Sequence, residues 1–257
     1  MDNRGIGIYD SGLGGLSVWR AIRERLPHES LLYLGDGKNC PYGLRSPEEI
    51  RTLAFRAVEE LLNRGCKMVV VACNTATNAA IEELRAHYPH IPFVGMEPAV
   101  KPACLLSKSG VVGVLATQSS IDGDMFHRTA AKYGENIRVI AKYGRGFVEL
   151  VEGDMERSPI AQEVVRGVVE EFTREGVDQI VLGCTHYPFL SETISRFAPH
   201  ANIIDPSPAV AKQTEKLLIE NDLLSTLDND VRCDFLSFAG DCYIKRLRKK
   251  ADEILRR

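Results

Sequence analysis

Several features that mark particular classes of protein are scarce in this sequence. Positive charge does not dominate, because 32 lysines and arginines stand against 35 acidic residues, for a formal net charge of -3. Nucleic acids and anionic membranes select clustered positive charge, so we expect neither as a partner. Apolar runs are too short to cross a bilayer, and residues 1–9 leave no room for a secretory signal. We therefore expect a cytoplasmic protein.

Cysteine pairs with a recognisable spacing are also missing. The seven cysteines are an odd number and show neither C-x-x-C nor the Cys/His spacing of a metal site. In a reducing compartment such a set predicts free thiols rather than a disulfide framework. We expect no metal, and each cysteine should be either buried or functional.

The sequence does contain a regular alternation of β-rich and helix-like segments. Apolar residues recur at helical spacing over 50–62 and 164–172, and 44% of the chain is hydrophobic, enough for a large core. Continuous apolar runs such as Met68–Ala72 are typical of parallel strands buried on both faces. The pattern predicts an α/β fold. The expected strands are Gly5–Tyr9, Leu31–Gly35, Lys67–Ala72, Pro92–Gly95, Val111–Leu115, Asn136–Ile140, Asp178–Leu182, Asn202–Asp205 and Asp234–Phe238.

A weak internal repeat divides the chain into two similar halves. Ile6–Ser11 resembles Val112–Thr117, and Val69–Thr75 resembles Gln179–Thr185. Each half thus carries a cysteine, Cys73 or Cys184, just beyond a buried strand. Ligands bind at the carboxyl ends of strands in open α/β sheets. If the halves face each other, the two cysteines line one cleft.

Both cysteines have two interpretations. A free cysteine is often a small core hydrophobe. At the start of a helix, however, unpaired N–H groups and the helix dipole favour a thiolate. Polar neighbours, Asn74 and Thr75 after Cys73 and Thr185 and His186 after Cys184, distinguish this pair from the other five cysteines. Such donors suit a carboxylate, although Asn74 and Thr75 also fit ordinary helix caps.

Two further loops contain polar or glycine-rich motifs. Asp10 and Ser11 follow the first predicted strand and precede Gly12–Gly15, which fits either a functional site or a simple turn. That segment lacks the lysine of a P-loop and the spacing of G-x-G-x-x-G, which argues against a nucleotide. Pro41–Gly43 also fits a turn.

Two opposed thiols suit one reaction in particular. Racemising an α-amino acid requires that a very weakly acidic proton leave one face of a carbon and that a proton return to the other. One group must be thiolate and the other thiol, each with a polar neighbour that adjusts its proton affinity. Asp10 and His186 are the candidates for these neighbours, because histidine titrates closest to physiological pH.

Taken together, these segments resemble the glutamate racemases of the aspartate/glutamate racemase family over most of the chain. The Cys-Asn-Thr and Cys-Thr-His blocks are shared with relatives that act on other substrates, whereas the Pro-Tyr-Gly loop indicates glutamate. The resemblance rests on Tyr9–Gly15, Tyr33–Asp36, Pro41–Gly43, Ala72–Ala76 and Gly183–Pro188.

The resemblance implies a role for each motif residue. Cys184 would deprotonate L-glutamate and Cys73 D-glutamate, with Asp10 assisting on the Cys73 side and His186 on the Cys184 side. Ser120 stands where the family often has threonine, and Glu152 falls where an acid near the site is expected, although the usual Cys-Pro-Leu is absent around 144–149. The substrate would contact Asp10, Ser11, Pro41, Tyr42, Gly43, Cys73, Asn74, Thr75, Thr117, Ser120, Cys184, Thr185 and His186.

The resemblance also implies an architecture and a cellular role. We expect two similar Rossmann-like domains with mainly parallel sheets, related by a pseudo-twofold axis, with the site in the cleft between them. Residues 1–97 and 207–257 would form the first domain and residues 98–206 the second. The protein would need no cofactor, would form a homodimer, and would supply D-glutamate for peptidoglycan, and hence for cell-wall biogenesis and cell shape.

Other functions remain to be tested. The basic run Lys245–Lys250 invites a nucleic-acid interpretation, but helical apolar spacing around it favours a solvated helix face. We find no convincing lysine and phosphate cup for pyridoxal phosphate. A thiol oxidoreductase would need a resolving cysteine, which sequence separation does not exclude. A racemase of another amino acid such as aspartate, or a two-lobed amino-acid-binding protein without chemistry, would also fit.

Overall fold

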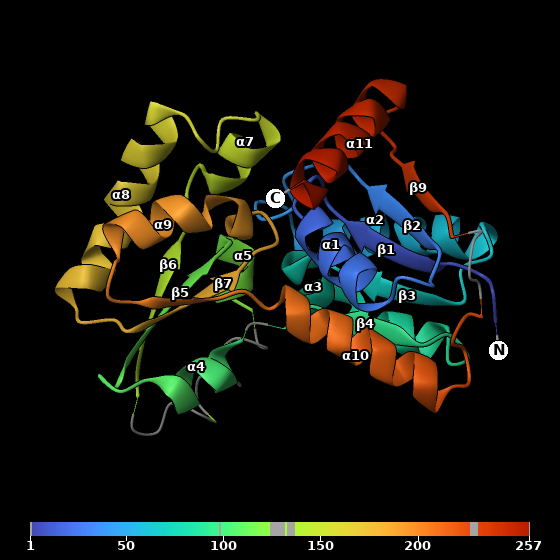
Figure 1. Cartoon of the computed structure of the whole chain (residues 1–257), viewed down its shortest axis with the longest axis horizontal. Helices are drawn as coiled ribbons and strands as arrows, with labels where there is room; N and C mark the ends of the chain where they lie inside the picture. Colours follow the sequence, from blue (N-terminus) through green and yellow to red (C-terminus); the bar gives the residue numbers. More distant parts are fainter. Residues whose placement is uncertain (1, 98, 124–131, 133–136, 227–230, 257) are drawn as a thin grey trace. The chain divides into compact units, whose positions relative to one another are not determined.

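The computed structural model describes residues 2–97, 99–123, 132, 137–226 and 231–256 (Figure 1). The chain forms two compact units. Unit 1 combines Met1–Met96 with Ser207–Arg257, and unit 2 is the continuous segment Glu97–Pro206. Among the described residues, no helix is both long and apolar enough to span a membrane.

Unit 1 is built on a five-stranded parallel sheet. Its order is β4-β3-β1-β2-β9, with Ile6 of the central strand paired to Leu31 on one side and Met68 on the other. All of β1 and β3 is buried, which explains their apolar sequences. The strands are β1 (Ile6–Asp10), β2 (Leu31–Gly35), β3 (Met68–Val71), β4 (Phe93–Gly95) and β9 (Cys233–Leu236).

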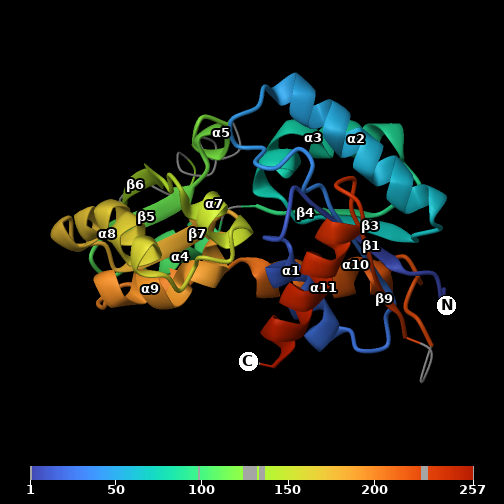
Figure 2. The ribbon, with the colours of Figure 1, turned by 90° about the horizontal axis from the view of Figure 1, so that it is seen from above.

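Within the part of unit 1 that the structure describes, five helices cover this sheet. They are α1 (Leu16–Arg25), α2 (Pro47–Asn63), α3 (Asn74–His87), α10 (Ser207–Glu220) and α11 (Asp241–Leu255). Figure 2 shows α2 and α3 on one face and α1, α10 and α11 on the other. The start of α2 is fixed by a capping box, in which Ser46 accepts from the Glu49 N–H and Glu49 accepts from the Ser46 N–H.

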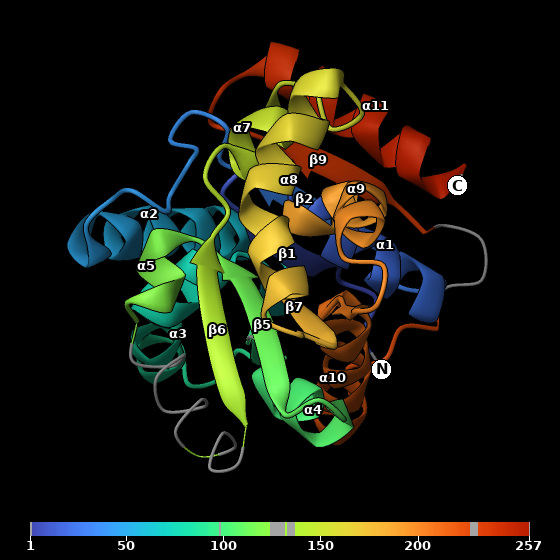
Figure 3. The same ribbon diagram turned by 90° about the vertical axis from the view of Figure 1, so that its left-hand side faces the viewer.

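Unit 2 contains a four-stranded parallel sheet of order β6-β5-β7-β8. Val112 and Val114 of β5 pack against α4, whereas Gly113 between them faces Phe172 of α8, so the two helices cover opposite faces. Figure 3 shows α8 beside the strands. The elements are α4 (Val100–Leu106), β5 (Val111–Ala116), α5 (Gln118–Ile121), β6 (Arg138–Tyr143), α7 (Phe147–Glu152), α8 (Pro159–Arg174), β7 (Gln179–Gly183), the 3-10 turn η1 (Tyr187–Leu190), α9 (Ser191–Phe197) and β8 (Asn202–Ile204).

The two sheets repeat one topology. Numbered within each unit, the first four strands lie in the order fourth, third, first, second: β4-β3-β1-β2 in unit 1 and β8-β7-β5-β6 in unit 2. The predicted α/β fold is confirmed, and each of the nine predicted strands is present with its ends shifted by up to three residues. Asn136, at the start of one predicted strand, lies outside the described residues. Cys73 and Cys184 follow the third strand of their respective units.

Candidate active site

In unit 1, polar side chains follow three neighbouring strands at their carboxyl ends. Asp10 ends β1 and Ser11 follows it, Asp36 follows β2, and Cys73 lies two residues beyond β3. All four side chains are buried. The parallel topology places these ends at one edge of the sheet, where ligands bind in α/β proteins.

Cys73 is the N-cap of α3. Its Sγ accepts a hydrogen bond from the Ala76 N–H at 3.4 Å and lies 3.7 Å from Ser11 Oγ. A sulfur in this position meets the positive end of the helix dipole, which favours thiolate over thiol. The alternative that Asn74 or Thr75 caps the helix is therefore wrong, since these are its first two residues.

Asn74 has a buried amide with unused hydrogen-bonding capacity. The residue is 4% exposed, and neither Oδ1 nor Nδ2 has a hydrogen-bond partner within the described ranges. Buried polar groups are nearly always paired, so an unpaired amide next to a candidate catalytic cysteine points to a ligand. Thr75 beside it is also buried.

The glycine-rich loop after β1 packs around Asp10. Asp10 Oδ2 accepts from the Gly12 N–H at 3.0 Å, and the Tyr33 hydroxyl donates to the Gly12 carbonyl at 2.7 Å. A Cβ on Gly15 would lie only 2.5 Å from the Asp10 Cβ. The glycines therefore allow close packing around a buried carboxylate. Asp10 stabilises the turn after β1 and also lies at the carboxyl edge of the sheet.

A chain of buried hydroxyls supports the loop that contains Pro41, Tyr42 and Gly43. The Tyr9 hydroxyl donates to that of Tyr42 at 2.8 Å, which in turn donates to Asp36 Oδ2 at 2.7 Å. Burial raises the pKa of both tyrosines well above the usual value, so both are neutral donors. Pro41 and Gly43 beside Tyr42 are half-buried.

Sequence reasoning did not assign functions to Tyr9 and Asp36. Asn39 completes their arrangement, donating from Nδ2 to both Asp36 oxygens at 3.1 and 2.9 Å. Asp36 could have been recognised as a candidate from its position directly after a buried strand, at the same edge of the sheet as Asp10 and Cys73.

In unit 2, Cys184 stands at the end of a second chain of contacts. Its Sγ lies 3.8 Å from His186 Nδ1, and His186 Nε2 lies 2.8 Å from Glu152 Oε1. The sulfur and the ring are buried, while the Glu152 side chain is 18% exposed. A carboxylate on one ring nitrogen orients the imidazole and directs the other nitrogen towards the sulfur.

Two neighbouring loops complete the edge of the unit 2 sheet. Thr117 and Ser120 are buried, and the Thr117 hydroxyl donates to Ser120 Oγ at 2.9 Å. Buried Thr185 lies between Cys184 and His186. The Tyr187 hydroxyl donates to the carbonyls of Ala116 and Gly144 at 3.2 and 3.4 Å, which ties the start of η1 to the end of β5 and to the residue after β6.

Each unit thus places a buried cysteine and an ionisable neighbour at the carboxyl edge of the same strand arrangement, as acid–base chemistry at carbon requires. The chain matches the family model described as Asp/Glu/Hydantoin racemase over residues 15–214. Fold and matched cysteine sites therefore define an amino-acid racemase-like α/β protein.

Individual relatives narrow this class. The chain is 44% identical over 250 residues to the glutamate racemase of Herpetosiphon aurantiacus, covering 97% of this chain and 98% of the relative. It is 40% identical to that of Clostridium perfringens over 256 residues, covering 99% and 98%. The chain belongs to the glutamate racemase family.

Solved structures of relatives share the fold. Glutamate racemase from Francisella tularensis, in complex with D-glutamate, is 29% identical with a TM-score of 0.86, and the match covers 98% of this chain and 95% of that one. The Escherichia coli enzyme, in complex with L-glutamate and the activator UDP-MurNAc-ala, is 28% identical with a TM-score of 0.86, covering 97% and 95%. The match therefore spans both units.

Proposed function

We propose that this chain interconverts L- and D-glutamate by passing the α-proton between Cys73 and Cys184 without a cofactor. The observation that carries the proposal is the repeated placement of a buried cysteine after the third strand of each unit. The relatives with bound D- and L-glutamate support glutamate as the substrate. In this proposal the two sulfurs act on the same α-carbon, one from each face.

The proton transfers balance with two sulfurs and no other reagent. For L-glutamate, the Cys184 thiolate takes the α-proton, and the C–H electron pair remains on the α-carbon. That carbon then takes a proton from the Cys73 thiol on the opposite face, which leaves D-glutamate and a Cys73 thiolate. The reverse reaction begins at Cys73. Each sulfur must therefore act both as thiolate and as thiol.

Neighbouring groups adjust the two sulfurs differently. On the Cys184 side, His186 lies 3.8 Å from the sulfur and is held by Glu152, so the ring can exchange charge and a hydrogen bond with the thiolate. On the Cys73 side, the Ser11 hydroxyl and the Ala76 N–H contact the sulfur, and Asp10 would assist from the end of β1. The two halves of the reaction are therefore chemically unequal.

Small polar groups around both cysteines would hold the substrate. The unpaired amide of Asn74 offers donors and an acceptor that suit a carboxylate or ammonium group. Ser120, with a hydroxyl but no methyl, would contribute one hydrogen bond. The remaining contacts would come from Ser11, Pro41, Tyr42, Gly43, Thr75, Thr117 and Thr185.

Isotope exchange separates the roles of the two cysteines. In D2O, the unmodified protein should racemise L-glutamate and place deuterium on the α-carbon of the product. Cys73→Ser and Cys184→Ser should each abolish racemisation, which is measured as decay of the circular dichroism signal of L-glutamate. Cys242→Ser, at an exposed cysteine, is the matched control and should retain full activity. Full turnover by both single variants would overturn the two-cysteine mechanism.

Substrate identity is tested with the same assay. L-aspartate and other amino acids should react much more slowly than L-glutamate. Faster turnover of aspartate would assign a different substrate. Binding of glutamate without decay of the signal would instead identify a two-lobed binding protein.

We also propose a cellular setting. A homodimer in the cytoplasm would supply D-glutamate for peptidoglycan synthesis, and the seven free cysteines are consistent with a reducing compartment. Sedimentation velocity tests the dimer, and fractionation of cells tests the compartment. A monomer across the working concentration range, or recovery with the membrane fraction, would contradict these assignments.

A further inference from the structure

A pocket lies in unit 1, on the β2–β9 side of the sheet. Its volume is about 650 Å3, and its lining includes Gly5, Ser30 and Arg232, which lie just before β1, β2 and β9. These residues lie at the amino ends of the strands. This part of the lining is therefore at the opposite edge of the sheet from Asp10 and Cys73, which lie at the carboxyl ends. Nothing in the proposed racemase mechanism uses this cavity.

Positive charge is concentrated around the cavity. Arg64 at the end of α2, Arg232 before β9 and Arg248 on α11 line it together with one acid, Asp234. The lining therefore has a formal charge of +2, although the whole chain carries -3. Three arginines from segments distant in the sequence favour an anion at this place.

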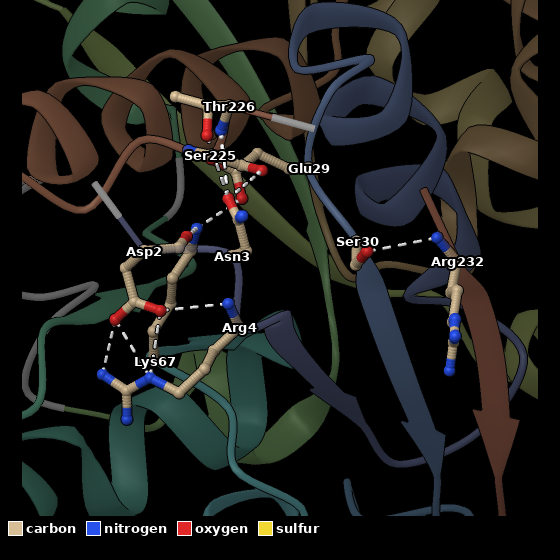
Figure 4. Close-up of polar contacts among 9 residues, drawn as sticks. All are labelled: Asp2, Asn3, Arg4, Glu29, Ser30, Lys67, Ser225, Thr226 and Arg232. Atoms are coloured by element: carbon tan, nitrogen blue, oxygen red, sulfur yellow. Dashed lines mark hydrogen bonds and ion pairs between the residues drawn. The ribbon is translucent and has the colours of Figure 1, made fainter. Parts of the chain in front are cut away.

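Two of the three guanidinium groups are available to a ligand. Arg64 forms an ion pair with Glu60 at 2.9 Å. Across the described ranges, the side chains of Arg232 and Arg248 have neither an ion pair nor a hydrogen bond, and both are exposed. The backbone of Arg232 is fixed, because its N–H donates to Ser30 Oγ at 3.1 Å (Figure 4).

The cavity also has an apolar part. Leu32 and Leu236 contribute to the lining from the adjacent strands β2 and β9, together with buried Phe235 of β9. A ligand that covered these side chains would gain from removing apolar surface from water. The lining thus matches a molecule with one anionic end and one apolar end.

We propose that this cavity binds organic phosphate monoesters, with the phosphate on Arg232 and Arg248 and the ester group on Leu32 and Leu236. A phosphate monoester carries nearly two negative charges at neutral pH and matches the charge of the lining. Guanidinium groups bind phosphate oxygens through paired hydrogen bonds. A monocarboxylate carries a single negative charge and would neutralise only half of the formal charge of the lining.

Calorimetric titration with phenyl phosphate at constant ionic strength tests the site. We expect saturable binding at one site, weakened about tenfold or more by either Arg232→Gln or Arg248→Gln, since each removes a charged donor pair. Asp234→Asn removes the one repulsive charge and should tighten binding. Arg166→Gln, an exposed arginine on α8, is the control and should leave binding unchanged.

Two kinds of result would contradict the proposal. The site is wrong if phenyl phosphate gives no saturable heat, or if both glutamine variants bind as tightly as the unmodified protein while retaining its circular dichroism spectrum. Inorganic phosphate should bind more weakly than phenyl phosphate, because it lacks the apolar group, and equal affinity would exclude the role of Leu32 and Leu236. None of these variants changes a residue of the racemase site, so each outcome is independent of the racemase assay.

Discussion

His186 Nε2 lies 2.8 Å from Glu152 Oε1, while its other ring nitrogen faces the sulfur of Cys184. The carboxylate therefore holds the ring in the orientation that the proposed proton transfer needs.

Replacing Glu152 by Gln should slow removal of the α-proton from L-glutamate more than from D-glutamate, while kcat/KM for racemisation falls equally in both directions because the two isomers have equal free energy. The amide keeps the shape but removes the charge that favours an imidazolium beside Cys184, so kcat from L-glutamate should fall about tenfold or more. Initial rates in both directions, with deuterium exchange at the α-carbon in D2O, give the measurement. An equal loss of exchange from both isomers would place the effect of Glu152 elsewhere.

Removing the hydroxyl of Tyr42 should weaken substrate binding. Tyr42→Phe breaks both the bond to Asp36 and the bond from Tyr9, and thereby loosens the Pro41–Gly43 loop. We expect a higher KM with a smaller change in kcat, and a loss of about 1–3 kcal/mol in the free energy of unfolding. Tyr9→Phe, which leaves the Tyr42–Asp36 bond intact, is the matched control and should have the smaller effect on KM.

Thiol reactivity should differ sharply between Cys66 and Cys242. Burial raises the pKa of Cys66 to about 12, so its thiolate fraction at about pH 8 is on the order of one in ten thousand. Cys242 is exposed on α11. Iodoacetamide labelling followed by mass spectrometry should modify Cys242 in the native protein and Cys66 only after unfolding. Comparable native rates would contradict the burial of Cys66.

The ion pair between Lys67 and Glu29 should matter strongly for stability. Its atoms lie 2.6 Å apart, and both side chains are at most 2% exposed. Lys67 also donates to the Asp2 carbonyl at 2.6 Å, and Glu29 accepts from the Ser225 N–H at 2.7 Å, which joins four segments distant in the sequence (Figure 4).

Lys67→Met should lower the free energy of unfolding by about 3–5 kcal/mol, because it leaves the Glu29 carboxylate buried without its counter-charge. Breaking the exposed pair of Arg51 and Glu83 with Arg51→Met should cost at most about 1 kcal/mol. Urea unfolding measures both. Similar costs for the two variants would show that burial does not govern these pairs.

The contribution of Asp178 to stability should depend on pH. Burial acts to raise its pKa, but hydrogen bonds from Ser107, Lys108 and Ser109 outweigh it and lower the pKa below the usual 3.8. The folded protein therefore favours the carboxylate, and its contribution is present above about pH 4 and is lost as the pH falls through the lowered pKa.

Asp178→Asn should accordingly be about 1 kcal/mol less stable at neutral pH. The difference from the unmodified protein should shrink below about pH 4, where Asp178 of the unmodified protein takes up a proton. Urea unfolding over this range provides the test. A difference that grew towards acid would reverse the assigned direction of the pKa shift.

The strands could be predicted because buried parallel strands have an unmistakable composition. Runs such as Met68–Ala72 have no polar face, and the repeat relates strands of matching position in the two units. Strand ends were harder to predict, since Asp10 and Gly183 belong to strands by backbone pairing although aspartate and glycine are typical of turns.

The polar contacts of the candidate site were harder to predict, because they join residues that are distant in sequence. Glu152 meets His186 across 34 positions, and Tyr9 meets Tyr42 across 33. No local pattern encodes such a pair. The unpaired amide of Asn74 could likewise not be predicted from the sequence, because it depends on the positions of the neighbouring donors and acceptors.

Unit 1 is interrupted in sequence by the whole of unit 2, and this has a consequence for synthesis on the ribosome. Residues 97–206 emerge before α10, which packs against α1, and before β9, which pairs with β2. During that interval the nascent sheet presents β2 as an unpaired edge, the kind of surface that recruits strands from other chains. Strand β9, which is translated after the whole of unit 2, therefore closes an edge formed by β2, which is translated before it.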